Sequence, residues 1–219
     1  MSKSLLTLAT LVACCLSLAG RADAQEHDAP RYEVGALFSA ITFTPSNGYR
    51  TEAGFGGRFT VNLTDHIGLE AETVFFPNSG FSAEQRAAGR ALQGQFGVKA
   101  GKRWEKWGVF AKGRPGFISF NNGRLVFDTT NTGTVFASHF ERATHFAFDV
   151  GGVLELYPTR HIVTRFDAGD TIIRYGRQSG TSLVLNPVTG QPEVAPFVLP
   201  ANTRHNFQFN AGIGYRFDD

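Results

Sequence analysis

Residues 204–217 read RHNFQFNAGIGYRF, and their alternation is the strongest indication of the fold. Within it, every second residue is apolar or aromatic, and the residues between them are small, polar or charged. A period of two puts two such sets on opposite faces of a β-strand. The apolar set is Phe207, Phe209, Ala211, Ile213, Tyr215 and Phe217, and the other set is Gln208, Asn210, Gly212, Gly214 and Arg216. We therefore predict a strand with one apolar and one polar face.

The same period recurs in seven earlier segments. They are residues 32–41, 52–63, 67–76, 90–102, 107–120, 144–157 and 162–175. Each has about the ten residues with which a tilted strand crosses a bilayer. After residue 24, no apolar run approaches the roughly 20 residues that a membrane helix needs. The sequence therefore predicts eight strands and no membrane helix in the mature chain.

The connections between these segments alternate in length. Residues 64–66, 103–106 and 158–161 are short turns, whereas the connections after the first, third, fifth and seventh segments are long. Short periplasmic turns and longer external loops are typical of membrane barrels. We predict an all-β fold, an eight-stranded antiparallel up-and-down transmembrane β-barrel with both termini in the periplasm. Loops as long as 121–143 and 176–203 are usually functional or disordered.

The N-terminus has the features of a secretory signal peptide. A basic start precedes an apolar run over residues 5–20, and Ala22-Asp23-Ala24 forms an A-x-A cleavage site. We predict cleavage after Ala24 and one barrel domain over residues 25–219. The alternative is a lipoprotein box at residues 11–14, in which Cys14 is lipidated, although the apolar run continues beyond it.

Composition excludes several kinds of site. Cys14 and Cys15 are the only cysteines, so the predicted mature chain has neither a disulfide nor a thiolate metal site. Removing Lys3, Arg21 and Asp23 with the signal leaves 21 − 2 = 19 basic and 19 − 1 = 18 acidic residues. A net charge of +1 does not indicate nucleic acid as a partner.

A period of two does not by itself say which face of the strands points into the barrel. Three features favour an apolar outer face: the export signal, a polar face rich in glycine and charge, and aromatic residues near both strand ends. We expect two aromatic girdles. They comprise Trp104, Trp107, Tyr157, Tyr215 and Phe217 near the short turns, and Phe75, Phe76, Phe120, Phe146, Tyr175 and Phe207 near the long loops. A soluble, lipocalin-like periplasmic binder with an apolar interior is the alternative.

We assign twelve charged residues to the alternate strand positions that are predicted to point into the barrel, here called the inward parity. The acids are Glu33, Glu70, Glu72, Asp149, Glu155 and Asp167, and the bases are Arg58, Lys99, Lys112, Arg114, Arg165 and Arg216. Buried charges are tolerated when they are paired and hydrogen-bonded. An eight-stranded barrel is narrow enough for side chains to fill. We therefore predict a structural ion-pair network and a closed polar lumen.

The fifth segment is less regular than the others. Phe110 shares its parity with Lys112 and Arg114, and Pro115-Gly116 then interrupts the alternation. This pattern predicts a bulge or a change of register near Pro115. In the seventh segment the alternation blurs after Asp170, so no facing is predicted beyond that residue.

The chain resembles the OmpA/opacity-type eight-stranded outer-membrane β-barrel proteins of Gram-negative bacteria, a porin-family type of barrel. The signal, the eight alternating segments and the end of the chain carry the resemblance. That end is similar to the C-terminal signal read by the barrel assembly machinery, with apolar residues at Phe209, Ala211, Ile213, Tyr215 and Phe217. The family usually stops at the last aromatic residue, whereas Asp218 and Asp219 follow it here.

The resemblance implies an integral protein of the outer membrane. The residues themselves indicate no cofactor, no metal and no catalytic residue. The protein's partners would be outer-membrane lipid, lipopolysaccharide, the assembly machinery and a surface ligand at the loops. A structural role in the cell envelope or an adhesion-like role would follow. The alternative on the same barrel is a lipid A-modifying enzyme, for which Ser138, His139 and Ser179 are candidates. His139, Glu141 and His145 could form a metal cluster, but we interpret them as residues of a surface loop.

Overall fold

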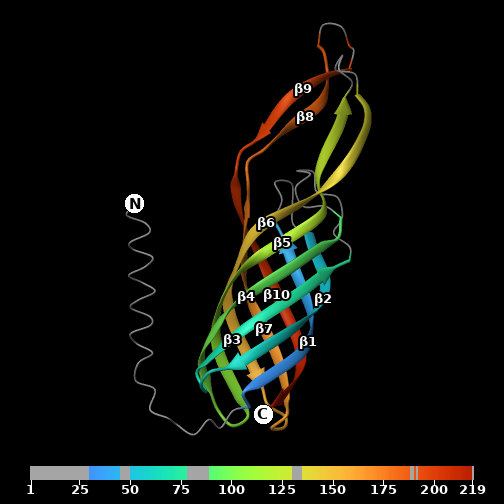
Figure 1. Ribbon diagram of the computed structural model, residues 1–219. Helices are drawn as coiled ribbons and strands as arrows, with labels where there is room; N and C mark the ends of the chain where they lie inside the picture. The colour runs from blue at the N-terminus through green and yellow to red at the C-terminus, as the bar shows by residue number, and fades with distance from the viewer. Residues whose placement is uncertain are drawn as a thin grey trace, which may run out of the picture.

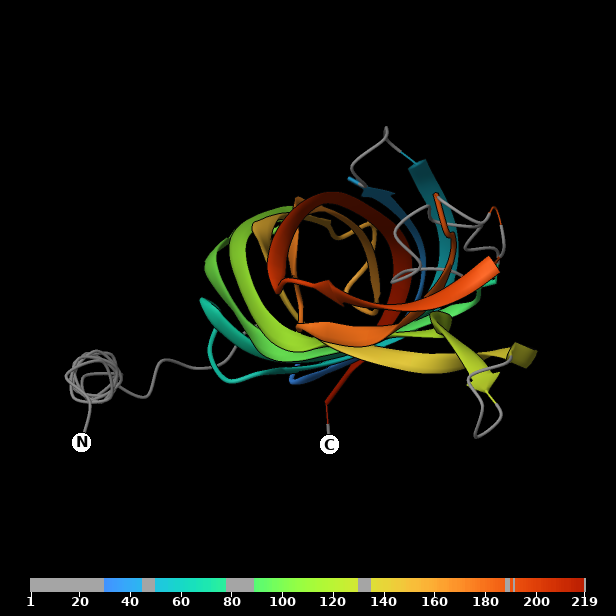
Figure 2. The same ribbon diagram turned by 90° about the horizontal axis from the view of Figure 1, so that it is seen from above.

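The computed structural model describes residues 30–44, 50–77, 89–129, 135–187, 190 and 192–218. Within these ranges, eight strands close into a barrel in the order β1-β10-β7-β6-β5-β4-β3-β2. Each neighbouring pair is antiparallel. Seen from above, the strands form a ring (Figure 2). The prediction of an eight-stranded antiparallel up-and-down barrel is confirmed.

The barrel strands follow the predicted segments closely. They are β1 (Tyr32–Phe43), β2 (Arg50–Asn62), β3 (Ile67–Phe76), β4 (Ala91–Arg103), β5 (Trp107–Thr129), β6 (Val135–Leu156), β7 (Ile162–Tyr175) and β10 (Asn202–Phe217). The largest difference is at β5 and β6, which remain paired up to Thr129 and Val135. Between β7 and β10, β8 (Gln178–Leu185) and β9 (Pro192–Leu199) form a separate two-stranded sheet. Both hairpins rise beyond the same end of the barrel (Figure 1), here called the long-loop end.

The irregularity predicted at Pro115 is wrong. β5 pairs with β6 in one register from Trp107 to Phe120, and Pro115 lies opposite Phe148. On its other side, the pairs with β4 keep one register across the proline. Pro115 is exposed, so its ring fits on the outer wall without an extra residue in the strand. The register shifts lie farther along, between Phe120 and Arg124 and between Asp128 and Thr129.

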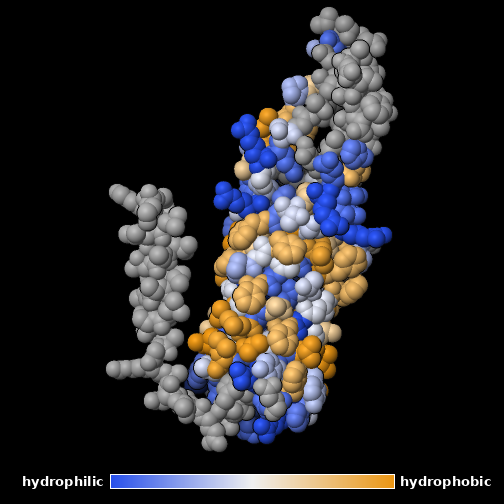
Figure 3. Space-filling view, viewed as in Figure 1, coloured by the Kyte–Doolittle hydropathy of each residue, from blue (hydrophilic) through white to orange (hydrophobic). Residues whose placement is uncertain are grey.

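The outer wall of the barrel is apolar. Large exposed side chains alternate along the strands, and examples are Phe55, Phe96, Phe146, Phe207 and Ile213. Hydrophobic residues form a band on the face shown in Figure 3, between hydrophilic regions at the two ends. Within the described ranges, no helix has the length and apolar character to cross a membrane. The outward orientation of the apolar face follows from the parity of the strands.

Four of the expected girdle residues instead lie inside. Phe76 and Phe120 are fully buried, Tyr175 is 6% exposed and Tyr157 is 7% exposed. Their parity is the inward one, and it decides their direction regardless of how near they lie to a strand end. The first three belong to an apolar cluster inside the long-loop end. Its members are Leu37, Ile41, Phe43, Val74, Phe76, Ala91, Ile118, Phe120, Ala147, Ile173 and Tyr175.

The remaining girdle residues do face outward. Trp104, Trp107, Tyr215 and Phe217 are exposed near the short turns, and the two tryptophan rings stack 4.0 Å apart. Phe146 and Phe207 are exposed near the long-loop end, and Phe75 is partly exposed there. Aromatic rings at both edges of an apolar band are typical of membrane interfaces.

Candidate functional site in the barrel interior

All twelve charged residues of the inward parity are buried, and Arg58 is the most exposed of them at 6%. They come from β1, β2, β3, β4, β5, β6, β7 and β10, so the whole ring of strands contributes to the interior. Burial of so many charges demands close partners, because an unpaired charge in a low dielectric is costly. The contacts between these residues therefore determine how the buried charges are stabilised.

Arg114 is the centre of one cluster. Its Nε and Nη2 donate to Asp149 Oδ2 over 2.9 and 2.6 Å, and its Nη1 donates to Glu72 Oε2 over 2.8 Å. Lys112 Nζ lies 2.9 Å from the same Asp149 oxygen. Arg58 Nη1 is farther away, 3.9 Å from Glu72 Oε2. One guanidinium thus bridges two carboxylates from different strands.

Arg165 and Lys99 form a second cluster, nearer the short turns. Arg165 binds both oxygens of Glu70, with 2.9 Å between Nη2 and Oε2, and its Nε donates to Asp167 Oδ1 over 2.6 Å. Lys99 Nζ lies 2.5 Å from Glu155 Oε1. Glu70 also lies 3.7 Å from Arg114 and 3.9 Å from Lys99. The two clusters are therefore continuous.

Arg103 also belongs to this network, although the sequence reading placed it in a turn. It is the last residue of β4 and continues the inward parity of Lys99, so this parity was the available signal. Its Nη2 lies 3.5 Å from Glu33 Oε1 and 3.5 Å from Glu155 Oε2. With Arg103 included, seven buried or half-buried cations lie in this network; its carboxylates are the six named above, and Glu52, also buried, pairs with Arg50.

Tyr157 follows β6 and connects Arg103 to the network. Its hydroxyl accepts a hydrogen bond from Arg103 Nε over 2.9 Å and donates one to Glu155 Oε2 over 2.7 Å. Burial, and next the negative charge of Glu155, raise the pKa of the Tyr157 hydroxyl well above its usual range. The hydroxyl therefore stays protonated and donates throughout the physiological pH range.

A layer of amide side chains follows the charged clusters. Gln93 and Gln208 exchange two hydrogen bonds of 3.0 and 3.1 Å, and Thr171 Oγ1 donates to Gln208 Oε1 over 2.6 Å. Asn210 Nδ2 donates to Glu72 Oε1 over 3.0 Å and so links the amides to the charges. The apolar cluster of the long-loop end comes next. Charged, amide and apolar layers thus succeed one another along the barrel axis.

Within the described ranges, the residues weighed for metal binding do not come together in one centre. His139 is exposed, with its Nε2 3.8 Å from Glu141 Oε1, whereas His145 is buried beside the rings of Tyr175 and Phe120. Among the described residues, no group of three or more histidine, cysteine or acidic side chains is arranged to hold a metal. Ser179 is exposed on β8, and the side chain of Ser138 lies outside the described part.

The C-terminal residues suggested as an assembly signal lie on β10, which closes the barrel against β1. Phe209, Ile213, Tyr215 and Phe217 are exposed on the outer wall, and Ala211 is partly exposed. Beyond the strand, Asp218 Oδ1 accepts a hydrogen bond of 2.9 Å from the backbone of Arg31. The residue after the last aromatic is thus held at the closing seam.

An apolar outer wall, aromatic edges and a charged interior in a closed eight-stranded barrel define the fold class of outer-membrane β-barrels. Among solved structures, Neisserial surface protein A aligns with a TM-score of 0.51 and 10% identity, covering 85% of this chain and 97% of that one. This likeness shows the fold.

Two further structures align less closely. OprG from Pseudomonas aeruginosa has 11% identity and a TM-score of 0.45, covering 90% of this chain and 100% of that one. Outer membrane protein W of E. coli has 17% identity and a TM-score of 0.40, covering 88% and 100%. No family model and no curated protein matches the sequence.

Proposed function

We propose that the protein is a non-enzymatic integral protein of the outer membrane, exported by a signal peptide that is cleaved after Ala24. Its lumen is closed, and it serves the envelope as a structural barrel or binds surface partners through its external hairpins. The observation that carries the proposal is the filling of the interior by the chain's own charged, amide and apolar side chains. With the interior occupied, the hairpins are the surfaces best placed to meet a partner.

The hairpins at the long-loop end support the surface-binding role. Leu185 is 71% exposed and Val198 is 51% exposed on the β8–β9 sheet, and Val184 is exposed beside them. Phe140, on the projecting part of β6, is exposed too. Apolar side chains gathered outside the membrane band mark a contact surface. We propose that these hairpins hold the surface ligand.

The steady conductance of the barrel in planar bilayers should be zero. Arg114, Gln208 and Phe120 stand for three successive layers across the interior, and each is at most 1% exposed. A barrel of eight strands has no room for a water-filled path beside such layers. Single-channel recording on folded protein tests this, and resolved conductance steps would contradict the closed lumen.

Two simple measurements separate this proposal from its alternatives. Membrane-fraction protein should migrate differently in SDS gels before and after boiling, as folded barrels do. Recovery from the soluble periplasm without such a shift would favour the lipocalin-like binder. The lipid A mass spectrum should be the same with and without the protein, whereas a change would favour the lipid A-modifying enzyme.

Lipopolysaccharide is the proposed partner of the rim at the long-loop end. Arg142, Arg174 and Arg177 line a cavity of about 530 Å³ there, together with a single carboxylate, Glu141. Guanidinium groups bind phosphate oxygens well because their planar donors match them. We propose that these arginines contact the phosphates of the lipopolysaccharide around the barrel.

Replacing Arg174 and Arg177 together by glutamine should weaken lipopolysaccharide binding by about tenfold, as expected when charge-assisted hydrogen bonds are lost. Co-sedimentation with lipopolysaccharide vesicles measures the change. The matched control replaces Arg31 and Arg90, which are exposed and lie outside this cavity. Equal weakening by both pairs would show a general charge effect and contradict a rim site.

A further inference from the structure

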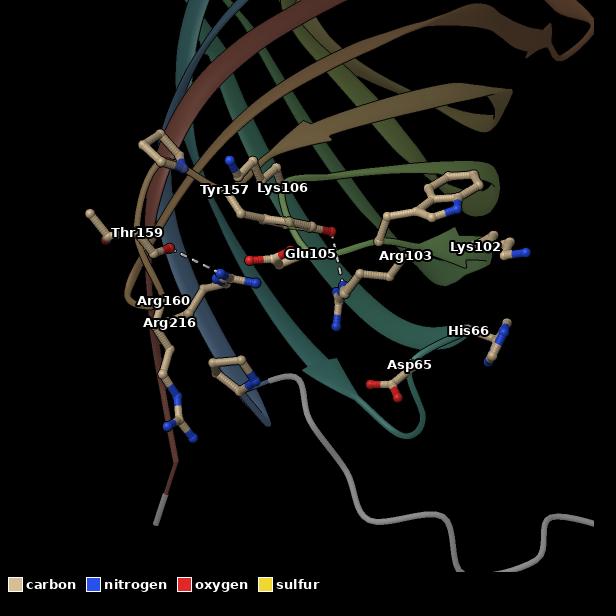
Figure 4. Close-up of a pocket in the computed structure, with 13 residues that line it drawn as sticks. Asp65, His66, Lys102, Arg103, Glu105, Lys106, Tyr157, Thr159, Arg160 and Arg216 are labelled. Atoms are coloured by element: carbon tan, nitrogen blue, oxygen red, sulfur yellow. Dashed lines mark hydrogen bonds between the residues drawn. The ribbon is translucent and has the colours of Figure 1, made fainter.

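We infer that the mouth of the barrel at the short-turn end is a binding site for a phosphate group. A cavity of about 780 Å³ opens there. The turns after β2, β4 and β6 surround it, and β10 contributes Arg216 (Figure 4). Its volume lies within the range of small-molecule sites. The inference depends on the fold alone and goes beyond the function proposed above.

The lining of this mouth is strongly basic. Its cations are Lys102, Arg103, Lys106, Arg160 and Arg216, and its carboxylates are Asp65 and Glu105, a balance of 5 − 2 = +3. Nearby carboxylates already have other partners. Glu33 and Glu155 lie near Lys99 as well as Arg103, and Asp218 lies 3.7 Å from Arg160. The lining of the mouth therefore carries an excess of positive charge.

Arg216 is the clearest sign of a missing anion. It is only 4% exposed, yet in the described part of the chain no carboxylate lies within 4.0 Å of its guanidinium. Its Nη2 donates to the carbonyl oxygen of Thr159 over 3.2 Å, and its Cζ lies 4.2 Å from the Tyr157 ring centroid. Its Nε has no acceptor among the described residues. Glu33 and Glu155 act on Arg216 only from beyond ion-pair distance, and a buried cation without a carboxylate in direct contact favours anion binding.

Arg103 brings a second guanidinium to the same place. Its side chain is 8% exposed, its Cζ lies 5.4 Å from the Tyr157 ring centroid, and its Nη1 also lacks an acceptor in the described part of the chain. Tyr157 thus contacts both guanidinium groups. Figure 4 shows Arg103 and Arg216 within the ring of turns, with Lys102 and Arg160 at its edges.

A phosphate group fits this arrangement better than a smaller anion. Its oxygens accept several hydrogen bonds in different directions, and two guanidinium groups with lysines nearby offer donors from several sides. The mouth also lies at the level of the Trp104–Trp107 stack, where rings mark the edge of the membrane. The phosphate therefore comes from one of two sources, a phospholipid headgroup or free phosphate in the periplasm.

Tryptophan fluorescence reports directly on this site. The chain has two tryptophans. Trp104 lines the mouth, and the ring of Trp107 stacks on the ring of Trp104. Folded protein in an uncharged, phosphate-free detergent is titrated with inorganic phosphate, with sodium chloride keeping the ionic strength constant. We expect a saturable change in fluorescence. An equal change with chloride alone would overturn the proposal.

Variants show whether the response comes from the mouth. Arg216→Gln and, separately, Lys106→Gln should each weaken phosphate binding by about tenfold, the effect of losing one charge-assisted hydrogen bond. Lys106 is exposed in a turn, so its variant folds independently of the interior network. Arg90→Gln, just before β4 at the long-loop end and outside the rim cavity, removes the same charge and should leave the titration unchanged. If neither mouth variant changes it, the mouth is not a phosphate site.

Nanodiscs distinguish the two sources. One set contains phosphatidylglycerol and the other a galactolipid without phosphate. If the headgroup is the ligand, fluorescence in phosphatidylglycerol already matches the phosphate-saturated state, and added phosphate changes it only in the galactolipid discs. If free phosphate is the ligand, the titration is the same in both.

Discussion

Phe209→Arg is expected to destabilise the assembled barrel by about 2–4 kcal/mol, the cost of an arginine on the lipid face near the middle of the bilayer. Phe209 points outward from β10 and is 38% exposed. Its neighbours across the strands are Ala40 and Ala168, which offer an arginine no acceptor side chain. The charge would therefore face hydrocarbon without a partner.

The folded fraction in lipid vesicles, measured by gel mobility over a urea series, tests this effect. Phe209→Leu keeps the apolar character and should fold as the native chain does. The next residue, Asn210, points inward and donates to Glu72 over 3.0 Å, so Asn210→Leu should cost about 1–3 kcal/mol through the lost buried hydrogen bond. Normal folding of Phe209→Arg together with failure of Asn210→Leu would mean that the apolar face points inward.

Arg114→Leu is expected to destabilise the barrel by about 3–5 kcal/mol, because it leaves buried carboxylates without their nearest counter-charge. The substitution removes the donors that reach Asp149 and Glu72. Lys112 remains 2.9 Å from Asp149, but Glu72 would keep only Arg58 at 3.9 Å as a nearby cation. The same urea series measures the loss.

Two controls isolate the buried pairing. Arg160→Leu breaks an ion pair with Asp218 that is largely exposed, so it should cost about 0–1 kcal/mol. Arg114→Leu combined with Asp149→Leu removes both partners of one pair and should destabilise by less than the sum of the two single changes. Additive effects would contradict an ion-pair network as the core of the interior.

The period-two pattern was sufficient for much of the fold because side-chain direction in a strand depends only on parity. It located β3 and β7 with the bounds seen in the structure. Where parity was set aside in favour of position along the strand, as for Phe76, Phe120 and Tyr157, the assignment was wrong.

The specific contacts between side chains inside the barrel could not be predicted from the sequence. Lys99 and Glu155 are 56 residues apart, and they meet because of the tilt and stagger of the strands, which no single segment encodes. The pattern did not set the outer bounds of β5 and β6, for another reason. Outside the membrane, both faces of a hairpin meet water, so the alternation that marks a barrel strand is not required there.

The length of β5 has a consequence for how the protein can change over time. Its 23 residues exceed the roughly ten needed to cross a bilayer by about 13, which at about 3.3 Å each is some 40 Å of further strand, measured along the tilted strand axis. That distance is larger than the roughly 30 Å hydrocarbon core itself. An antibody bound to the projecting part of β5, or an epitope inserted there, would therefore be remote from the bilayer and from the ionic interior. Substitutions can thus accumulate in this part of β5, or a peptide can be displayed on it, while the wall beneath it stays unaltered.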